Sequence, residues 1–339
     1  MPDSSLPLLL LIIVFAIGFG MVNGFNDAAN AIGASIGTRA LSPRNAVILA
    51  TVFNFAGAAT GLAVARTIGK GILIPEAISY LTVIAGLAAV IVWGGIASYW
   101  GLPVSITHSF VTGLAAAGAA VVGSDAIQWN VMQRVLSAVV TAPVLGFAGG
   151  FVVMVILFWL FRRSAPARMR AVFSRLQWFT SAFLAYSHGK NDGQMPISVI
   201  TMALVIFFGD ESLWERLSLF DPKTGWIIVL SALAISSGMA IGGWRVVKTL
   251  GFRVTALQPV HGFAANFSAA TIIEIASHLG IPVSTTHCAS SAIIGVGATK
   301  RFSAVRWGVA GNIVAAWILT FPICAGLGYL FAWLLGMIF

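Results

Sequence analysis

Long uncharged apolar runs alternate with short polar connections along almost the whole chain. The runs cover residues 6–23, 45–65, 77–99, 135–161, 178–187 continuing through 194–209, 225–243, 263–279 and 307–339. A helix that crosses a membrane needs about 20 apolar residues, so each run predicts such a helix or a part of one. The 339 residues therefore predict about ten to twelve membrane segments and no large domain outside the membrane.

Two shorter stretches, residues 102–123 and 281–298, have a different composition. They are rich in Gly, Ala, Ser and Thr, and each has a proline at its beginning. Non-helical backbone at membrane depth persists only where protein or water satisfies its polar groups. We therefore expect a re-entrant hairpin in each stretch.

The same stretches contain an internal repeat. Ile96–His108 reads IASYWGLPVSITH and Ile275–His287 reads IASHLGIPVSTTH, with nine of thirteen positions identical. Upstream of each copy stands a Gly-x-Asn-Asp motif, at Gly24–Asp27 and at Gly189–Asp192. The repeat predicts two related halves, each with one Asn-Asp motif and one hairpin.

Composition and charge support a membrane protein and orient it. The chain is 59% hydrophobic and 9% charged, with a mean hydropathy of +0.96. Basic residues fill the connections at 162–175, 245–253 and 300–306, whereas the connection at 210–223 is mainly acidic. The positive-inside rule places the basic connections in the cytoplasm and the acidic one outside. The net charge of +9 thus reflects orientation in a lipid bilayer, and no nucleic-acid partner is expected.

The charge pattern also predicts how the halves are related. We place the first repeat at residues 1–161, a basic cytoplasmic linker at 162–177 and the second repeat at 178–339. The two Asn-Asp motifs are then approached from opposite faces of the membrane, which is typical of inverted-topology repeats with broken helices and a binding site near the midplane. The predicted fold is an all-α, polytopic protein of the cell membrane.

Several polar residues lie inside apolar runs. They are Asn26, Asp27, Asn30, Asn191, Asp192 and Gln194. Burying a carboxylate there costs at least about 2.5 kcal/mol. A structural cluster that joins helices is one explanation. The occurrence of the motif in both halves favours a substrate or ion site.

The hairpins supply a second set of polar groups. Pro103 and Pro282 are expected in the first turn of a helix, beside the hydroxyls of Ser105, Thr107, Ser284, Thr285 and Thr286. Helix N-termini bind anions, so two of them could hold an oxyanion without Lys or Arg. The alternative is that these hydroxyls bond back to their own helices.

Carboxylates next to an anion require a cation that binds with it. This predicts a symporter in which the oxygens of Asp27, Asp192 and the asparagines Asn26, Asn30 and Asn191 hold Na⁺, or in which the two carboxylates accept protons. Phosphate is favoured over sulfate, because phosphate retains a hydroxyl that can donate to a carboxylate. A symporter of sulfate or another oxyanion remains an alternative, as does an anion channel.

Other titratable residues receive weaker interpretations. His108 and His287 end the repeated hairpin sequence and either orient the hairpins, exchange a proton or are structural. Glu274 has no counterpart in the first half, where Gly95 stands, and is a candidate cation site. His188, His261 and His278 are assigned no function.

Enzyme function has little support in the sequence. It contains no nucleophile elbow, zinc motif, Walker loop or cysteine cluster. Haem ligation by His108 and His287 would make a membrane oxidoreductase, but both lie in hairpins rather than in continuous helices. We expect neither catalytic activity nor a cofactor other than the coupling cation.

The motifs together resemble those of the Pit-type inorganic phosphate transporters. The resemblance rests on GFNDAANAIGAS at 24–35, TRALSPR at 38–44, SHGKNDGQ at 187–194, GFAANFSAATIIE at 262–274 and PVSTTH at 282–287. It implies an inverted-repeat symporter, often a homodimer, that binds phosphate beside Na⁺ or H⁺. It also implies that the Asn-Asp motifs and Gln194 contact phosphate or the cation, and that the hairpin hydroxyls hold phosphate.

The chain departs from the family pattern at three positions. Asn26 stands where many bacterial members have His and resembles the form found in sodium-coupled relatives. Ile106 replaces a usual Thr, and Met195 replaces a more polar residue. These departures imply a less symmetrical site.

Overall fold

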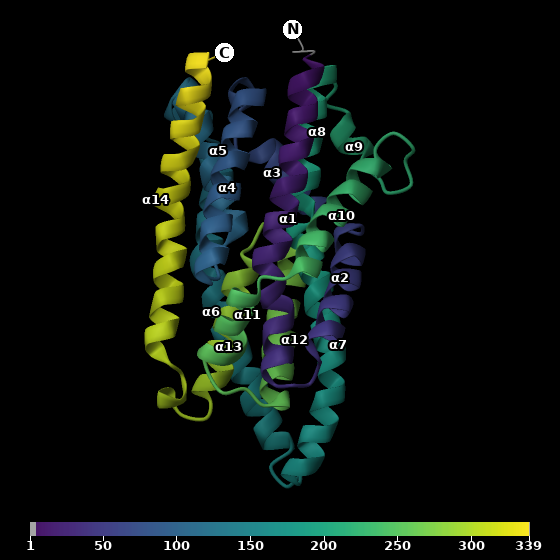
Figure 1. Ribbon diagram of the computed structural model, residues 1–339, viewed down its shortest axis with the longest axis vertical. Helices are drawn as coiled ribbons and strands as arrows, with labels where there is room; N and C mark the ends of the chain where they lie inside the picture. Colours follow the sequence, from purple (N-terminus) through teal and green to yellow (C-terminus); the bar gives the residue numbers. More distant parts are fainter. Residues whose placement is uncertain (1–4, 339) are drawn as a thin grey trace.

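A computed structural model describes residues 5–338 as a bundle of helices (Figure 1). The first half contains α1 (Leu6–Gly37), α2 (Pro43–Ala58), α3 (Ala63–Gly71), η1 (Pro75–Ala77), α4 (Tyr80–Trp100), α5 (Ile106–Val122), η2 (Ser124–Ala126) and α6 (Trp129–Leu160). The second contains α7 (Pro166–Asp192), α8 (Gln194–Phe208), α9 (Leu213–Arg216), α10 (Gly225–Ile241), α11 (Trp244–Lys248), η3 (Thr249–Arg253), α12 (Pro259–His278), α13 (Thr285–Ala298), η4 (Phe302–Ala304) and α14 (Trp307–Ile338).

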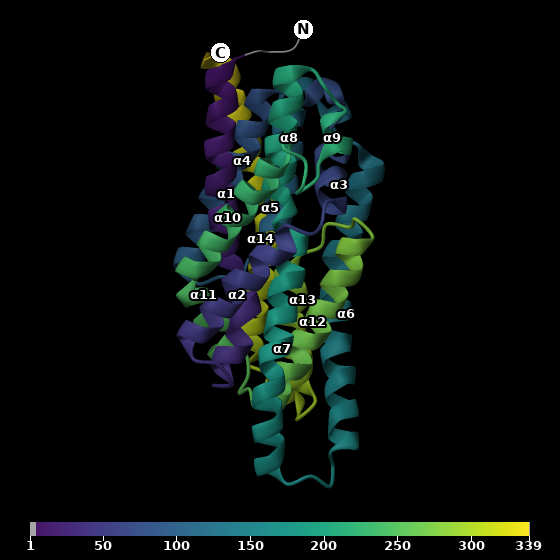
Figure 2. The same ribbon diagram turned by 90° about the vertical axis from the view of Figure 1, so that its right-hand side faces the viewer.

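The two halves run in opposite directions. Helix α1 begins at the end of the bundle where α14 finishes, whereas α7 begins at the other end (Figures 1 and 2). The basic connection between α6 and α7 lies at that second end, and the acidic connection around α9 lies toward the first. The arrangement agrees with the inverted repeat that the charge pattern predicts.

Fewer helices cross in one piece than the ten to twelve segments expected. Residues 5–338 contain five helices long and apolar enough to span a membrane, or up to seven if each bent pair counts as one span. The bent pairs are α2 with α3, at 64°, and α10 with α11–η3, at 57°. The other expected segments are shorter or more polar helices, including both arms of the second hairpin.

The Asn-Asp motifs lie within a helix in the first half and at the end of a helix in the second. Helix α1 runs without interruption through Asn26 and Asp27, and only Gly193 separates α7 from α8. The bends fall instead at residues 59–62 and at Gly242, which has a φ of +70° that glycine adopts without strain.

Each predicted hairpin is a tip and one helical arm. Residues 102–123 form the tip and α5, and residues 281–298 form the tip and α13; the opposite arms are α4 and α12. The prolines lie outside the helices, contrary to expectation. Ser105 and Ser284 are the N-caps instead, and their hydroxyls accept hydrogen bonds from the backbone N–H of His108 and His287 at 3.2 and 3.1 Å.

The basic linker is also shorter than predicted. Helix α7 begins at Pro166, so only residues 161–165 form a connection and the rest of the expected linker is helical. Arg168 and Arg175 are exposed on the first turns of α7.

The halves interlock because helices of one pack on helices of the other. Helix α1 packs on α10, and α7 packs on α2 in the equivalent way. Gly24 allows the first contact, since a Cβ there would collide with the backbone of Ile235, and Gly189 allows the second against Asn54. Likewise α6 packs on α13, and α14 packs on α5.

The hairpin tips rest on short helices from the opposite half. Gly101 and Gly280 open the two tips with φ of +74° and +68°. A Cβ at Gly101 would lie 3.2 Å from the Arg245 backbone on α11, and one at Gly280 would lie 3.4 Å from the Ala63 carbonyl oxygen on α3. Each tip therefore packs closely against a short helix of the other half.

Candidate functional site

Two carboxylates, one from each half, meet at the centre of the bundle. Asp27 on α1 and Asp192 at the end of α7 are 1% and 0% exposed. The Thr285 hydroxyl lies 3.4 Å from Asp27 Oδ2 and 3.0 Å from Asp192 Oδ2. One side chain of the second hairpin thus bridges the two carboxylates.

The hairpins exchange a reciprocal pair of contacts. Thr286 donates to Asp27 Oδ1 at 2.7 Å, and its hydroxyl lies 3.0 Å from the Val104 carbonyl oxygen. The equivalent Thr107 lies 3.4 Å from Asp192 Oδ1 and 3.5 Å from the Val283 carbonyl oxygen. Each threonine therefore reaches the aspartate and the hairpin tip of the other half, so neither half forms the site alone.

The helix ends add an electrostatic contribution. Helices α5 and α13 both begin at the cluster, at Ile106 and Thr285. A helix N-terminus carries roughly half a positive charge, so the two termini place partial positive charge beside the buried carboxylates. The same field would favour an oxyanion.

Two asparagines fix the hairpin arms to the motif helices. Asn26 donates to the Ser98 hydroxyl on α4 at 2.7 Å. Asn191 lies 3.0 Å from the Ser277 hydroxyl on α12. With its amide oxygen toward Ser277, its nitrogen donates to Asp192 Oδ1 at 2.9 Å. These equivalent bonds place Asn26 and Asn191 at the edge of the cluster.

Asn30 has no equivalent contact in the second half. Its amide lies 3.0 Å from both Asp27 Oδ1 and the Thr286 hydroxyl. Met195 occupies the matching position and cannot form these bonds. Gln194 bonds elsewhere: it accepts from the Ala65 N–H on α3 at 3.0 Å and donates to the Lys190 carbonyl oxygen.

Glu274 lies apart from the two aspartates. It forms an ion pair with Lys190 and accepts from the Ser187 hydroxyl at 3.4 Å. Both partners of the ion pair are partly exposed. The structure thus brings together the predicted aspartates and threonines, but it does not bring Glu274 into their cluster.

His188, which received no role from the sequence, lies between the carboxylates. Its Nε2 is 3.5 Å from Asp27 Oδ2 and 3.3 Å from Asp192 Oδ2, and its Nδ1 is 2.6 Å from Asn54 Oδ1. The three titratable side chains could share a cation, because their ligand atoms lie within 4.8 Å of one another. The i,i+4 spacing of His188 and Asp192 on one helix face was the available signal.

The hairpin histidines face each other rather than the aspartates. The rings of His108 and His287 lie 5.0 Å apart, and His287 packs against Trp317 of α14 at 4.0 Å. Trp317 donates to the Pro103 carbonyl oxygen at 3.0 Å. This aromatic cluster joins the two hairpins behind the site.

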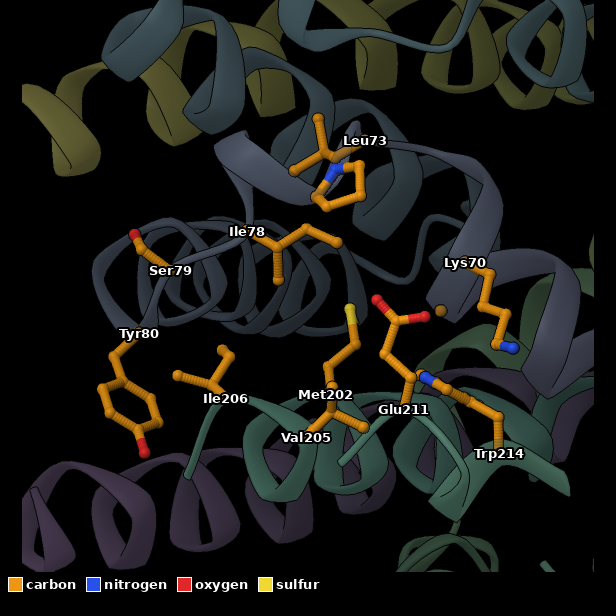
Figure 3. Close-up of a pocket in the computed structure, with 12 residues that line it drawn as sticks. Lys70, Leu73, Ile78, Ser79, Tyr80, Met202, Val205, Ile206, Glu211 and Trp214 are labelled. Carbon is orange, nitrogen blue, oxygen red and sulfur yellow. The ribbon is translucent and has the colours of Figure 1, made fainter. Parts of the chain in front are cut away.

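The carboxylate cluster is closed to both surfaces. A pocket of about 470 Å³ lies between α3, the start of α4, α8 and α9 (Figure 3). Lys70 and Glu211 are its charged residues, beside apolar side chains such as Met202 and Ile206. None of the cluster residues lines it. Helix α3 nevertheless links this pocket to the motif through Gln194.

Fold and site together define a multi-pass membrane transport protein, with a buried polar site shared by two inverted halves. Comparison with known proteins gives the family. A model described as "Phosphate transporter family" matches residues 23–328. The chain therefore belongs to this family of phosphate transporters, and it is not an enzyme.

Individual relatives agree. The chain is 38% identical to a probable low-affinity inorganic phosphate transporter of Bacillus subtilis, over 99% of this chain and 100% of the relative. It is 39% identical to a protein of the same description from Rhizobium meliloti, over 95% and 96% of the two chains. A solved structure described as "The sodium-dependent phosphate transporter" matches 98% of this chain and 100% of its own, with a TM-score of 0.88 and 27% identity.

Proposed function

We propose that this transporter carries inorganic phosphate into the cell together with Na⁺, by alternating access to the site between Asp27 and Asp192. The main observation behind this proposal is that threonine hydroxyls from both hairpins contact these two buried carboxylates. When the substrate enters, the same hydroxyls and the N-termini of α5 and α13 would bind its oxygens.

Charge balance is the first argument for symport. Two ionised carboxylates and an anion in one buried site repel each other strongly, because screening by water is weak there. Among residues 5–338, no Lys or Arg forms an ion pair with Asp27 or Asp192, and Lys190 is paired with Glu274. Besides His188, which lies between the two carboxylates, and the partial charges of the two helix N-termini, the compensating positive charge would come from a cation bound with the substrate.

Oxygen ligands support Na⁺ as that cation. Carboxylate oxygens lie beside the hydroxyl oxygens of Thr107 and Thr286 and near the carbonyl oxygens of Val104 and Val283. Carbonyl oxygens at interrupted helices are common Na⁺ ligands in inverted-repeat transporters. The sodium dependence named for the similar solved structure agrees with this choice.

The carboxylates also support phosphate over sulfate. Monohydrogen phosphate can donate its hydroxyl to Asp27 or Asp192, whereas sulfate has no proton to donate and would leave a carboxylate facing a negative charge. The family and the relatives' descriptions point to the same substrate.

Uptake of radiolabelled phosphate into proteoliposomes tests the proposal. We expect uptake under an inward Na⁺ gradient, little uptake without a gradient, and no inhibition by excess sulfate. Uptake driven only by a proton gradient would replace Na⁺ with H⁺. Competition by sulfate would indicate a general oxyanion symporter, and flux independent of any cation gradient would indicate an anion channel.

The carboxylates are tested by single substitutions. We expect Asp27→Asn or Asp192→Asn to reduce Na⁺-driven uptake by at least about 100-fold, since each removes a charge that the coupled cation needs. Asp125→Asn, at an exposed position in η2, is the matched control and should transport normally. Near-normal uptake by either site variant, at equal protein incorporation, would rule out the assigned role.

A further inference from the structure

A second polar pocket, distinct from the carboxylate site, lies on the side of the first hairpin tip that the charge pattern assigns to the cytoplasm. Its volume is about 430 Å³. It is lined by Tyr99, Trp100, Gly101, Arg245, Lys248 and Arg253, from the end of α4 and from α11–η3. Three of the six lining residues are cationic, and none is acidic.

The positive charge of this pocket is not neutralised by the protein. Arg245, Lys248 and Arg253 are exposed, and none of them forms an ion pair within residues 5–338. No Asp or Glu occurs in the connections at 38–44, 161–177, 242–258 or 299–306. An anion in the pocket would therefore meet three cations without acidic competition.

One cation is already held in place. The Arg245 guanidinium lies over the Tyr99 ring, 4.3 Å from its centroid, and donates to the Tyr99 carbonyl oxygen. Stacking and a backbone bond reduce the freedom of this long side chain before any ligand arrives, and a preorganised arginine binds phosphate oxygens in a fixed, fork-like geometry. Its remaining N–H groups are available for that contact.

Exposed aromatic side chains surround the cations. Tyr99 and Trp100 are 65% and 62% exposed, and Trp244 and Phe252 are 47% and 46% exposed. Tyr and Trp are enriched at membrane–water interfaces, and basic pockets between membrane helices on the cytoplasmic side bind phosphate-containing lipid headgroups.

We propose that the pocket formed by Arg245, Lys248 and Arg253 binds a phosphate group at the cytoplasmic surface. Two sources offer this chemistry, namely the headgroup of an anionic phospholipid and free inorganic phosphate. The exposed aromatic residues favour a phospholipid as the ligand, because they can contact a lipid, whereas free phosphate has no apolar group for them to contact.

A bound phosphate group would connect the pocket to the first hairpin. The Thr249 hydroxyl donates to the Gly101 carbonyl oxygen at 2.9 Å, and the next carbonyl oxygen, of Leu102, lies 3.5 Å from Asn26 Nδ2. A ligand that bridges α4 to α11–η3 therefore stabilises the present position of the first tip. Binding to the folded state alone also raises thermal stability.

The test measures thermal unfolding and lipid binding of the full-length protein in detergent. The probes are phosphatidylglycerol, phosphatidylcholine as the zwitterionic reference, and inorganic phosphate. The pocket variant is Arg245→Gln with Lys248→Gln and Arg253→Gln. The matched control removes three exposed cations from the same face, with Arg163→Gln, Arg168→Gln and Arg175→Gln. Lys248→Gln alone serves if the triple variant does not fold.

We expect phosphatidylglycerol to bind the native and control proteins more tightly than phosphatidylcholine does. The pocket variant should lose about a hundredfold in affinity, at roughly fivefold for each cation. If instead the lipids do not differ, but inorganic phosphate stabilises the native protein more than the pocket variant, the source is free phosphate. Equal losses in the pocket and control variants, or no ligand effect that depends on the pocket, would overturn the proposal.

Discussion

Thr285 is the side chain that joins the two carboxylates, and its counterpart in the first hairpin is Ile106. Its hydroxyl is within reach of both Asp27 and Asp192, whereas Ile106 is fully buried with no polar atom to offer. Two identical halves would place such a hydroxyl at both positions, but here only Thr285 provides one.

Removal of this hydroxyl should weaken transport. We expect Thr285→Val to lower the uptake efficiency, kcat/KM, by about 10- to 100-fold, because a hydrogen bond to a charged group contributes about 1.5–3 kcal/mol. The measurement is initial phosphate uptake in proteoliposomes across a range of phosphate concentrations. Thr141→Val, at an exposed position on α6, should leave uptake unchanged; equal effects of the two variants would show that Thr285 acts only in folding.

For single residues, the sequence identified members of the site better than it predicted which of them are in contact. The repeated Asn-Asp motifs and hairpin hydroxyls identified residues that the structure brings together, because a polar group that recurs in an apolar run needs a partner. The i,i+4 spacing could have paired His188 with Asp192, but the sequence could not show that His188 also reaches Asp27, because that contact depends on the packing of α7 on α1. Nor did it reveal that Lys190 pairs with Glu274, because the two residues meet only through the packing of α7 on α12.

Elements of one half pack on elements of the other, and close backbone contact makes this possible. Gly24 and Gly189 occupy equivalent positions, and each faces the backbone of a helix from the opposite half. Helices approach this closely only where the side chain is a hydrogen atom. The sequence displayed these glycines within its motifs, but periodicity cannot tell which helix a glycine faces.

A methyl group at Gly24 or Gly189 should push apart the two helices that meet there. We expect Gly24→Ala or Gly189→Ala to destabilise the protein by about 1–3 kcal/mol, the usual cost of overpacking, and to lower the thermal unfolding midpoint in detergent. Gly308→Ala is the control, because a Cβ there has no neighbour within 4 Å. An unchanged midpoint for both site variants would mean that the interlocked contacts are looser than the structure shows.

The positions of the helix bends could not be read from the sequence. The sequence predicted broken helices without giving their positions; in the structure α1 is continuous, and the chain bends between α2 and α3 and between α10 and α11. The glycines at the actual bends, such as Gly242, are less conspicuous in a chain with 36 glycines.

The whole molecule combines two opposed halves with a one-sided distribution of charge. Its fold class and membrane location follow from its composition, and the basic connections predict its orientation. The number of continuous spans could not be predicted in the same way, because it depends on where packing permits a helix to bend.

Orientation can be tested with single cysteines. The native Cys288 and Cys324 are both 0% exposed and should not react. We expect a membrane-impermeant maleimide to label Phe220→Cys on intact cells, since this position in the acidic connection is 91% exposed. Ala165→Cys, in the connection before α7, should be labelled only after the cells are opened. The reverse pattern would invert the topology.

The differences between the halves fall together around the carboxylates, and this has a consequence for direction. In the alignment of the two repeats, His188 is equivalent to Asn23, Thr285 to Ile106 and Asn30 to Met195. Each half therefore has a polar side chain where the other has an apolar one. A site with identical halves would look the same to a molecule arriving from either compartment. These differences make the two sides of the site chemically unequal, so a substrate that enters from outside contacts different side chains from one that enters from the cytoplasm.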